Sequence, residues 1–316
     1  MAMAATSKTP RPPAGTSQAL LTSRENRWLK DFRVALRGGL PTNSGAVGVE
    51  GARLVEEALR SGCRVEAVLF SEAGERHRER LAAFTNRPET AFPVLRTTDR
   101  LFEGLADTEH PQGVAVLVHP RRASLDELLN PSGTACAALL VVLAGVQDPG
   151  NVGTILRTAA AFGATGAVTA ASGQSGTASP FSPKALRASA GAALHLPILQ
   201  GMSLPILLTQ LRIGKVHTLA SSAHETHDAA PSSRVPAAFL PWEVDWCQPT
   251  AVLVGNEGSG LPEEVERSAD ARIRIPMASG VESLNAAAAA AVLFYEAARQ
   301  RNSLLQKTMQ TGTATP

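Results

Sequence analysis

Residues 148–153 (DPGNVG), with Arg157 beyond them, form the first of three segments whose side chains could do chemistry. Pro149 and Gly150 predict a turn, and Asn151 is expected to cap the helix that follows. Arg157 lies six residues after Asn151, under two helical turns along, so it can project toward the same end of a sheet. A guanidinium there could grip a phosphate or stabilise developing negative charge. A capped helix with a surface arginine explains the same residues without any function.

The second segment, residues 255–260 (GNEGSG), follows an apolar run and places three glycines around Glu257. Glycine lets a backbone approach a ligand closely or adopt a positive φ. The spacing differs from the dinucleotide-binding fingerprint G-x-G-x-x-G, and no acid follows about 20 residues later. Gly214 and Lys215 precede Val216, so the sequence contains no ATP-binding P-loop either. A ligand-binding loop and a tight turn without function both remain open.

The third segment, residues 275–285 (IPMASGVESLN), leads into six alanines. Ser283 or Asn285 is expected to cap the final helix, which is a purely structural role. Alanine side chains permit a close approach between helices. We therefore expect the final helix to pack against another element or a second subunit.

The three segments can act together only if the elements that carry them place them at the same edge of one sheet. Residues 137–146 are a continuous apolar run, typical of a central strand in a parallel sheet. Helix and strand patterns then alternate, which predicts a mostly parallel sheet with helices on both faces. Ligands in such sheets bind beyond the carboxyl ends of the strands, where all three segments lie. The expected strands are 165–170, 216–221, 250–254 and 272–276, and the expected helices are 152–163, 183–191, 203–213, 262–268 and 283–300.

Composition along the chain predicts two domains and two tails. Residues 1–22 are rich in Ala, Ser, Thr and Pro and are predicted to be disordered. Residues 23–120 predict a small α/β domain, and residues 121–136 a linker. Residues 137–305 form the predicted second domain, and residues 306–316 a tail. The smaller domain is expected to contain helices at 26–36 and 51–61 and strands at 47–49, 65–70 and 114–118.

Composition also excludes several classes of protein. Of the 316 residues, 44% are hydrophobic and 18% are charged, which excludes a wholly disordered chain. The longest apolar run, residues 135–146, has 12 residues, whereas a membrane span needs roughly 20. Neither a secretory signal nor a CxxC pair occurs, and three scattered cysteines predict no disulfide framework. We therefore expect a cytoplasmic protein with no membrane contact.

Charge is unevenly distributed along the chain. Residues 1–37 contain seven basic and two acidic side chains, a balance of +5, although the whole chain carries only +2. A basic segment on a near-neutral body is compatible with a polyanionic partner such as nucleic acid, although solvated basic tails are also common. With only 13 aromatic residues, a platform that stacks single-stranded bases is not expected.

Two further groups of residues have weaker signals. His224 and His227 are three residues apart but have no third ligand nearby, so we expect no metal site. Arg187, in the segment SPKALRAS, could contact a phosphate or could be an ordinary charge on a helix surface.

Taken together, the three segments resemble the three motifs of the SpoU/TrmH family of RNA ribose methyltransferases, within the SPOUT superfamily. The matching stretches are DPGNVGTILRTAAAFGATG, LVGNEGSGLP and IPMASGVESLNAAAAAAVLFYEA. The resemblance extends over roughly residues 23–305, because NRWLKDFRVAL, VEGARLVEEAL and HPQGVAVLV are similar to the small substrate-binding domain of many members. Two departures are Ala286 with Ala287, in place of a small aliphatic and polar pair, and Gly-rich residues 38–48, where a basic stretch is usual.

The resemblance implies a C-terminal domain with a deep trefoil knot, a homodimer, and S-adenosylmethionine bound in a bent form. It places three residues at the cofactor, largely through backbone groups: Gly255, Ile275 and Leu284. It also implies an RNA contact for Arg187. Five residues match the active-site polar set of the family: Asn151, Arg157, Glu257, Ser283 and Asn285.

The implied reaction is methylation of a ribose 2′-hydroxyl in structured RNA, without a metal. Arginine has a pKa above about 12, so we expect Arg157 to stabilise the developing alkoxide as a cation. Ser283 and Asn285 would orient the hydroxyl, while Glu257 would hold Arg157 or Asn151. The two-domain layout favours ribosomal RNA over transfer RNA by analogy alone. A non-catalytic RNA-binding assembly factor on the same fold is the alternative, although such a binder has no need for Arg157, Ser283 and Asn285 together.

Overall fold

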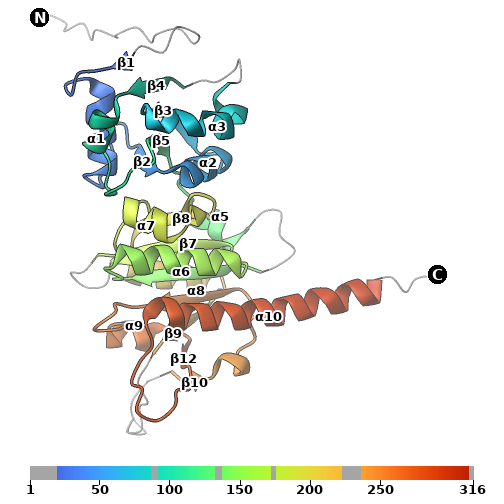
Figure 1. Cartoon of the computed structure of the whole chain (residues 1–316). Coiled ribbons are helices and arrows are strands. Elements are labelled where there is room, and N and C mark those ends of the chain that lie inside the picture. Colours follow the sequence, from blue (N-terminus) through green and yellow to red (C-terminus); the bar gives the residue numbers. More distant parts are fainter. Residues whose placement is uncertain (1–19, 87–91, 132–136, 172–175, 223–235, 313–316) are drawn as a thin grey trace, which may run out of the picture. The chain divides into compact units, whose positions relative to one another are not determined.

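The computed structural model describes residues 20–86, 92–131, 137–171, 176–222 and 236–312. The chain divides into two compact units along the sequence, an N-terminal unit that ends at His119 and a C-terminal unit that begins at Pro120 (Figure 1). Each unit contains its own sheet.

The sheet of the C-terminal unit has seven strands, and every pair of neighbouring strands is parallel, as predicted. The strand order is β10-β12-β9-β11-β6-β7-β8. The two central strands, β6 and β11, are buried along their whole length because their side chains are apolar on both faces. The strands are β6 Leu139–Ala144, β7 Gly166–Ala171, β8 Ile198–Ser203, β9 His217–Ser221, β10 Ala238–Phe239, β11 Thr250–Val254 and β12 Ala271–Ile273.

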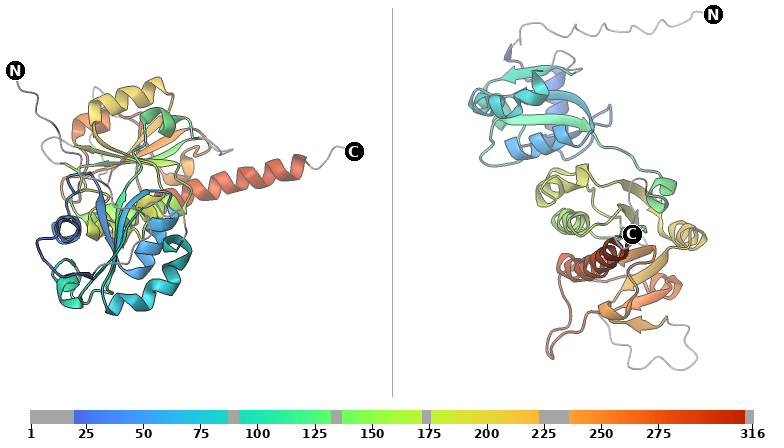
Figure 2. Two further views of the ribbon diagram at one scale, coloured as in Figure 1. Left: turned by 90° about the horizontal axis from the view of Figure 1, so that it is seen from above. Right: turned by 90° about the vertical axis from the view of Figure 1, so that its right-hand side faces the viewer.

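Helices cover both faces of this sheet, as the alternation of patterns predicts (Figure 2, right). On one face Leu128, Leu207 and Val265 belong to three different helices that share a core with the sheet. These helices are α5 Leu125–Leu129, α8 Leu204–Ile213 and α9 Glu263–Ser268. The helices on the opposite face are α6 Pro149–Ala161, α7 Pro183–Ala188 and α10 Ala286–Gly312. Two short 3₁₀ helices are η2 Ala192–Leu194 and η3 Pro241–Glu243.

The N-terminal unit has a mixed sheet of five strands in the order β1-β4-β3-β5-β2, with β5 antiparallel to both its neighbours. Helix α1 covers one face, while α2 and α3 lie on the other side of the sheet (Figure 2, left). The strands are β1 Leu20–Leu21, β2 Val47–Glu50, β3 Arg64–Phe70, β4 Val94–Thr97 and β5 Val114–His119. The helices are α1 Arg27–Leu36, α2 Ala52–Arg60, η1 Ala73–His77, α3 Arg78–Thr85 and α4 Asp99–Glu103.

Three predicted boundaries need correction. The disordered tail predicted for residues 1–22 ends earlier, because Leu20 and Leu21 pair with β4; residues 1–19 lie outside the described residues. The predicted linker 121–136 contains α5, which Ser124 caps and which buries Leu128. The tail predicted for residues 306–316 is helical to Gly312, because helix-favouring residues continue past the apolar face of α10.

A buried arginine attaches α10 to the sheet. The Arg301 guanidinium, 7% exposed, donates hydrogen bonds to four backbone carbonyls. The acceptors are the carbonyl oxygens of Ala137 (2.6 Å), Ala138 (3.2 Å), Trp246 (2.7 Å) and Gln248 (3.1 Å). Because these residues immediately precede β6 and β11, Arg301 joins α10 to the two central strands.

Replacing Arg301 with methionine should therefore destabilise the C-terminal unit. Several carbonyls at the start of the central strands would lose a charged donor, and we expect a loss of about 2–4 kcal/mol of unfolding free energy. Urea unfolding followed by tryptophan fluorescence measures this, because Trp246 is fully buried beside the arginine. Arg299→Met is the matched control, since among the described residues the exposed Arg299 guanidinium bonds Glu296 alone, and its loss should change stability little. Equal urea midpoints for the two variants would contradict this role.

Candidate active site

The first two segments meet at one edge of the sheet because the strands before them are parallel neighbours. Val254, at the end of β11, is paired with Leu143 of β6, so both strands end at the same edge. The loop after β6 leads into α6, and the loop after β11 contains Glu257. The third segment ends there too, because Asn285 at the start of α10 contacts Asn151 of α6.

Helix α6 begins earlier than the sequence predicts, and its cap is Asp148 rather than Asn151. The Asp148 Oδ1 atom accepts a hydrogen bond from the Gly150 backbone nitrogen (3.1 Å), and Pro149 occupies the first helical position. Asp148 also pairs with the ammonium of Lys184 on α7 at 2.6 Å. The Lys184 hydrogen bond, together with the Gly150 N–H, lowers the pKa of Asp148. Asn151 therefore lies inside the first turn, and its side chain is free to bond across the site.

The Glu257 carboxylate is the centre of the hydrogen-bond network at this edge. Its two oxygens accept from the backbone nitrogens of Gln147 (3.2 Å) and Asp148 (3.1 Å) and from Asn151 Nδ2 (3.0 Å). Asn285 Nδ2 in turn donates to Asn151 Oδ1 (3.1 Å). The network Glu257–Asn151–Asn285 thus joins one residue from each of the three segments, and Glu257 holds Asn151 and not Arg157.

These donors keep Glu257 ionised. Partial burial alone would raise the pKa of Glu257, but hydrogen bonds from Asn151 and from the backbone N–H groups of Gln147 and Asp148 outweigh it, and the pKa is lowered from 4.5. At neutral pH Glu257 is therefore an ionised carboxylate whose hydrogen bonds all come from uncharged N–H groups.

The loop that carries Glu257 is folded by Asn256, which sequence analysis did not single out. The Asn256 Oδ1 atom accepts from the backbone nitrogens of Gly258 (2.9 Å) and Ser259 (3.1 Å), and Nδ2 donates to the Gly145 carbonyl (3.0 Å). A Cβ atom at Gly255 would lie 2.4 Å from the Gly260 carbonyl carbon, so this glycine is required by the close approach of the loop to itself. The signal in the sequence was an asparagine between glycines, which favours an Asx turn.

Asn285 is the cap of α10, one of the two alternatives that the sequence left open. Its Oδ1 atom accepts from the backbone nitrogens of Ala287 (2.8 Å) and Ala288 (3.4 Å). Ser283 is exposed, and its hydroxyl makes no hydrogen bond among the described residues.

Arg157 lies on α6 outside this network. Its side chain is exposed, and within the described part of the chain the guanidinium forms no hydrogen bond or ion pair. A cation that is not neutralised by the protein is available to an anionic ligand. Arg187 lies in the last turn of α7 and is half-buried.

The segment 275–284 offers backbone groups and apolar side chains together. Within it the described structure contains one backbone hydrogen bond, from the Val281 nitrogen to the Ala278 carbonyl (3.3 Å). Val281 and Leu284 are 51% and 40% exposed, and Ile275 is half-buried. Ligand sites combine apolar side chains with a few polar groups, and this segment offers both.

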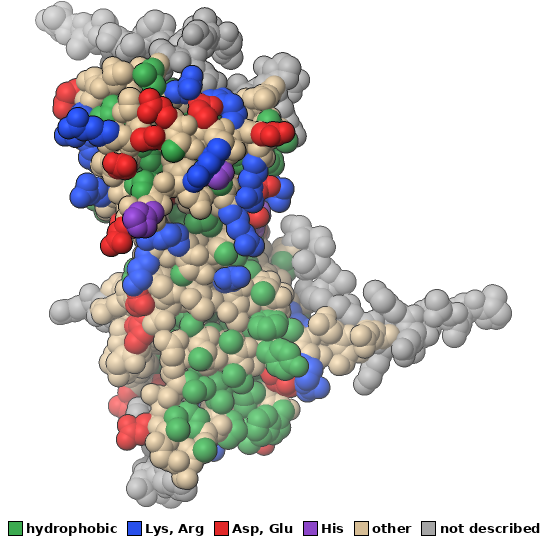
Figure 3. All heavy atoms as spheres, in the orientation of Figure 1, with side chains coloured by type: hydrophobic (Ala, Val, Ile, Leu, Met, Phe, Trp, Pro, Cys, Tyr) green, Lys and Arg blue, Asp and Glu red, His purple; other side chains and the backbone are tan. Residues whose placement is uncertain are grey.

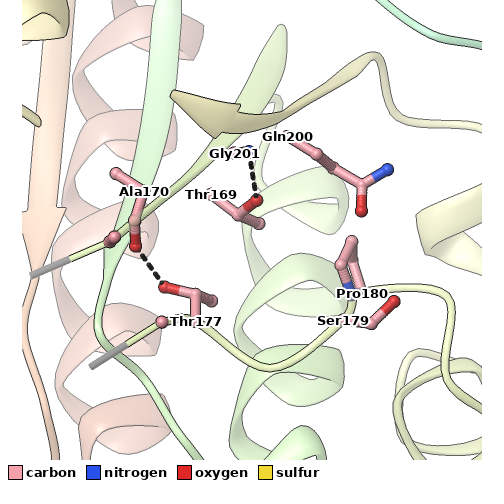
Figure 4. Close-up of a pocket in the computed structure, with 9 residues that line it drawn as sticks. Thr169, Ala170, Thr177, Ser179, Pro180, Gln200 and Gly201 are labelled. Carbon is pink, nitrogen blue, oxygen red and sulfur yellow. Dashed lines mark hydrogen bonds between the residues drawn. The ribbon is translucent and has the colours of Figure 1, made fainter. Parts of the chain in front are cut away.

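An open pocket of about 280 Å³ lies at the carboxyl ends of β7 and β8 (Figure 4). Gln200 faces Ser179 and Pro180 across it. Thr177 lines one side of the pocket. Its hydroxyl oxygen accepts a hydrogen bond from the Gly145 backbone nitrogen (2.9 Å), which connects the pocket to the loop after β6. Gly145 also receives the hydrogen bond from Asn256, so this pocket adjoins the Glu257 loop.

Comparison with known proteins identifies the family. The model of the SpoU rRNA methylase family matches residues 138–295, and that of the MRM3-like substrate binding domain matches residues 42–116. An uncharacterised tRNA/rRNA methyltransferase of Synechocystis is 34% identical over 92% of this chain and 97% of its own length. The chain belongs to the SpoU rRNA methylase family, and it is a methyltransferase that acts on RNA.

Two more relatives carry more specific descriptions. The Bacillus subtilis 23S rRNA (guanosine(2553)-2′-O)-methyltransferase RlmP is 28% identical over 87% of this chain and 97% of its own length. The crystal structure of an AdoMet-bound rRNA methyltransferase from Sinorhizobium meliloti superposes with a TM-score of 0.71 at 29% identity. That match covers 89% of this chain and 97% of the other.

Two expectations concern features outside this site. Within the described residues, no helix is long and apolar enough to span a membrane. The described residues also contain no group of three His, Cys, Asp or Glu side chains able to hold a metal ion. His224 and His227 lie outside the described residues.

The lowered pKa of Glu257 predicts how Glu257→Gln responds to pH. Because the pKa is lowered in the folded state, Glu257 contributes its full stabilisation above 4.5, its ordinary value, and loses it as pH falls through the folded-state value. Above pH 4.5 the wild type should therefore be more stable than the variant by a constant difference in unfolding free energy. This difference should shrink as the pH falls below 4.5 and through the folded-state pKa of Glu257. Urea unfolding of both proteins across this range is the measurement. A margin that grows on acidification would show that the carboxylate is not held by these donors.

Proposed function

We propose that this RNA methyltransferase methylates a ribose 2′-hydroxyl in structured RNA, with ribosomal RNA as the preferred substrate. The observation that supports the proposal most strongly is the network Glu257–Asn151–Asn285, which brings the three segments to one edge of the sheet. The RlmP relative is described as a 2′-O-methyltransferase of 23S rRNA, which favours the same chemistry here. A cytoplasmic location belongs to the same proposal.

The cofactor is S-adenosylmethionine, and the third segment suits it. Ile275 and Leu284 supply apolar contacts and unused backbone groups for an adenine ring, and Gly255 supports the adjoining loop. When bound, the cofactor supplies an electrophilic methyl group on a sulfonium.

Polar residues of this chain would then act on the RNA. Methyl transfer would form a bond between the 2′-oxygen and the methyl carbon and break the bond from that carbon to sulfur, which would leave as a neutral thioether. The hydroxyl proton would pass to water, and negative charge would develop on the oxygen as the proton departs. Arg157 stabilises this charge and grips the adjacent phosphate as a cation, because a guanidinium stays protonated at neutral pH. Ser283 and Asn285 orient the hydroxyl, Glu257 fixes Asn151, and Arg187 contacts the RNA.

Transfer of radiolabelled methyl groups from S-adenosylmethionine to total RNA tests the proposal. The RNA is separated by size and digested to nucleosides. We expect label in a 2′-O-methyl nucleoside of one ribosomal RNA. Label in transfer RNA would overturn ribosomal RNA as the preferred substrate, and label on a base would overturn the ribose chemistry. Cofactor that binds without label appearing in any RNA, precursor particles included, would favour a non-catalytic assembly factor.

Arg157→Ala should reduce methylation by at least about 100-fold, which is the usual effect of losing one charge-stabilising donor. Binding of S-adenosylmethionine, measured by calorimetry, should stay near that of the wild type. The matched control is Arg212→Ala, an exposed arginine on α8 whose guanidinium bonds the Ser268 carbonyl. Unchanged turnover in Arg157→Ala would contradict this role.

We further infer a homodimer that buries the exposed side of α10. Val292 and Tyr295 are 42% and 57% exposed there, and Tyr295 packs edge-on against Phe162, the C-cap of α6, with ring centroids 5.7 Å apart. Figure 3 shows hydrophobic side chains gathered over this part of the C-terminal unit. Such a patch is typical of a subunit interface. The same proposal includes the trefoil knot that the family resemblance implies. The knot would lie in the segment between β11 and α10.

Tyr295→Glu should convert the dimer to a monomer, because it places a charge in an apolar contact. Light scattering coupled to size-exclusion chromatography measures the mass. Glu296→Gln is the matched control, because the Glu296 carboxylate already pairs with Arg299 of the same helix, and this variant should remain a dimer. A wild-type mass equal to one chain of 33.0 kDa would refute the dimer.

A further inference from the structure

The outward side of α1 carries a row of basic side chains that the proposed reaction does not use. Arg27, Lys30, Arg33 and Arg37 follow one another at intervals of three or four residues. Side chains at this spacing lie along one side of a helix, with neighbouring Cβ atoms about 5–6 Å apart. We call these four residues the basic row of α1.

The packing of α1 fixes the direction in which the basic row points. Leu29, Phe32 and Leu36 are fully buried and belong to the core beneath α1. The basic row occupies the other side of the helix, where three of its members are exposed and Arg33 is half-buried. Figure 3 shows Lys and Arg side chains on the side of the N-terminal unit where Figure 1 draws α1.

The basic row is mostly not neutralised by the protein. Lys30 pairs with Glu25 at 2.5 Å. Arg27, Arg33 and Arg37 form no ion pair within 4.0 Å among the residues that the structure describes. Residues 24–37 together contain five basic and two acidic side chains, so the surface around α1 is strongly positive.

Basic residues on the other side of the same sheet are arranged differently. There Glu56 pairs with Arg60 and Arg80, and Glu75 pairs with Arg78. Each of these carboxylates is shared between two guanidinium groups, since Glu75 also accepts from Arg96. Exposed Arg53 and Arg76 on that side form no ion pair among the described residues, so what distinguishes α1 is the regular spacing of its cations along one side of a single helix.

Arg27 is also partly fixed in position. Its guanidinium carbon lies 4.7 Å from the centroid of the Trp28 ring, a cation–π contact that restricts the side chain. A guanidinium that is restricted in advance loses less conformational entropy when it binds a phosphate. Stacking leaves the N–H groups at the guanidinium edge able to donate to phosphate oxygens.

We propose that the basic row of α1 binds the sugar–phosphate backbone of the RNA substrate. This rests on the proposed function, since it takes RNA as the substrate. The row spans eleven residues from Arg27 to Arg37, and their ten intervals cover about 15 Å along the helix axis, which matches a short stretch of one strand. Contacts to phosphate oxygens confer affinity and not sequence specificity. The row also precedes residues 42–116, the part of this unit that matches a substrate-binding family.

The variant Arg27→Gln/Lys30→Gln/Arg37→Gln tests the proposal, with ribosomal RNA as the probe. Filter binding of the RNA over a range of salt concentrations should show a salt dependence smaller by about 2–3 in the slope of log K against log salt, since each phosphate contact contributes about 0.7–0.9. In the methylation assay KM for RNA should rise by at least about tenfold, while kcat at saturating RNA stays near that of the wild type.

The matched control removes three exposed positive charges from α2, η1 and α3, in the variant Arg53→Gln/Arg76→Gln/Arg80→Gln. Arg80 pairs with Glu56 as Lys30 pairs with Glu25, so each triple variant breaks one ion pair. This control should bind RNA as the wild type does, and Arg27→Lys/Arg37→Lys should retain most of the binding.

An unchanged salt slope in the α1 variant, or an equal loss in the control, would overturn the proposal. The binding assay does not require methyl transfer, so it separates this inference from the proposed function. If the wild type transfers no methyl group but the α1 variant alone loses RNA binding, the basic row is supported and the proposed function fails. If methyl transfer occurs but the wild type and the α1 variant have equal salt slopes, the proposed function is supported and the role of the basic row fails.

Discussion

One carboxylate holds the candidate active site together. Glu257 follows β11, but three of its hydrogen-bond donors belong to the loop after β6 and the first turn of α6. Because β6 and β11 are neighbouring parallel strands, their loops leave the sheet side by side, and the carboxylate connects them. Asn285 extends the same connection to α10 through Asn151. Without an ionised group at Glu257, two backbone N–H groups and one amide would lose their acceptor.

The carboxylates of Glu257 and Asp148 have partners other than Arg157. Glu257 is satisfied entirely by neutral donors, and Asp148 takes the ammonium of Lys184. Neither carboxylate therefore neutralises the guanidinium, which stays exposed on α6. Arg301 shows the opposite arrangement, since backbone carbonyls hold it inside the unit. The first arginine therefore stays exposed on α6, whereas the second fastens α10 to the central strands.

The sequence predicted the framework better than the contacts within the site. Long apolar runs specify buried strands, and β11 occupies the predicted residues 250–254. The cap of α6 was wrong because Asp148 and Asn151 are equally good capping residues, and only Pro149 at the first helical position decides between them. The hydrogen bond between Glu257 and Asn151 joins residues 106 positions apart, which no local pattern can specify. Short elements such as α5 and β4 were missed because they form mainly through tertiary packing.

The most direct test of this account is a double-mutant cycle on turnover with Asn151→Ala and Glu257→Gln. If Glu257 acts on the reaction by holding Asn151, the double variant should lose no more kcat than the more damaging single variant. Binding of S-adenosylmethionine to each variant should be measured alongside, so that kcat is compared at saturation. Losses in kcat that multiply in the double variant would show that the two residues act independently, and would contradict a site organised around Glu257.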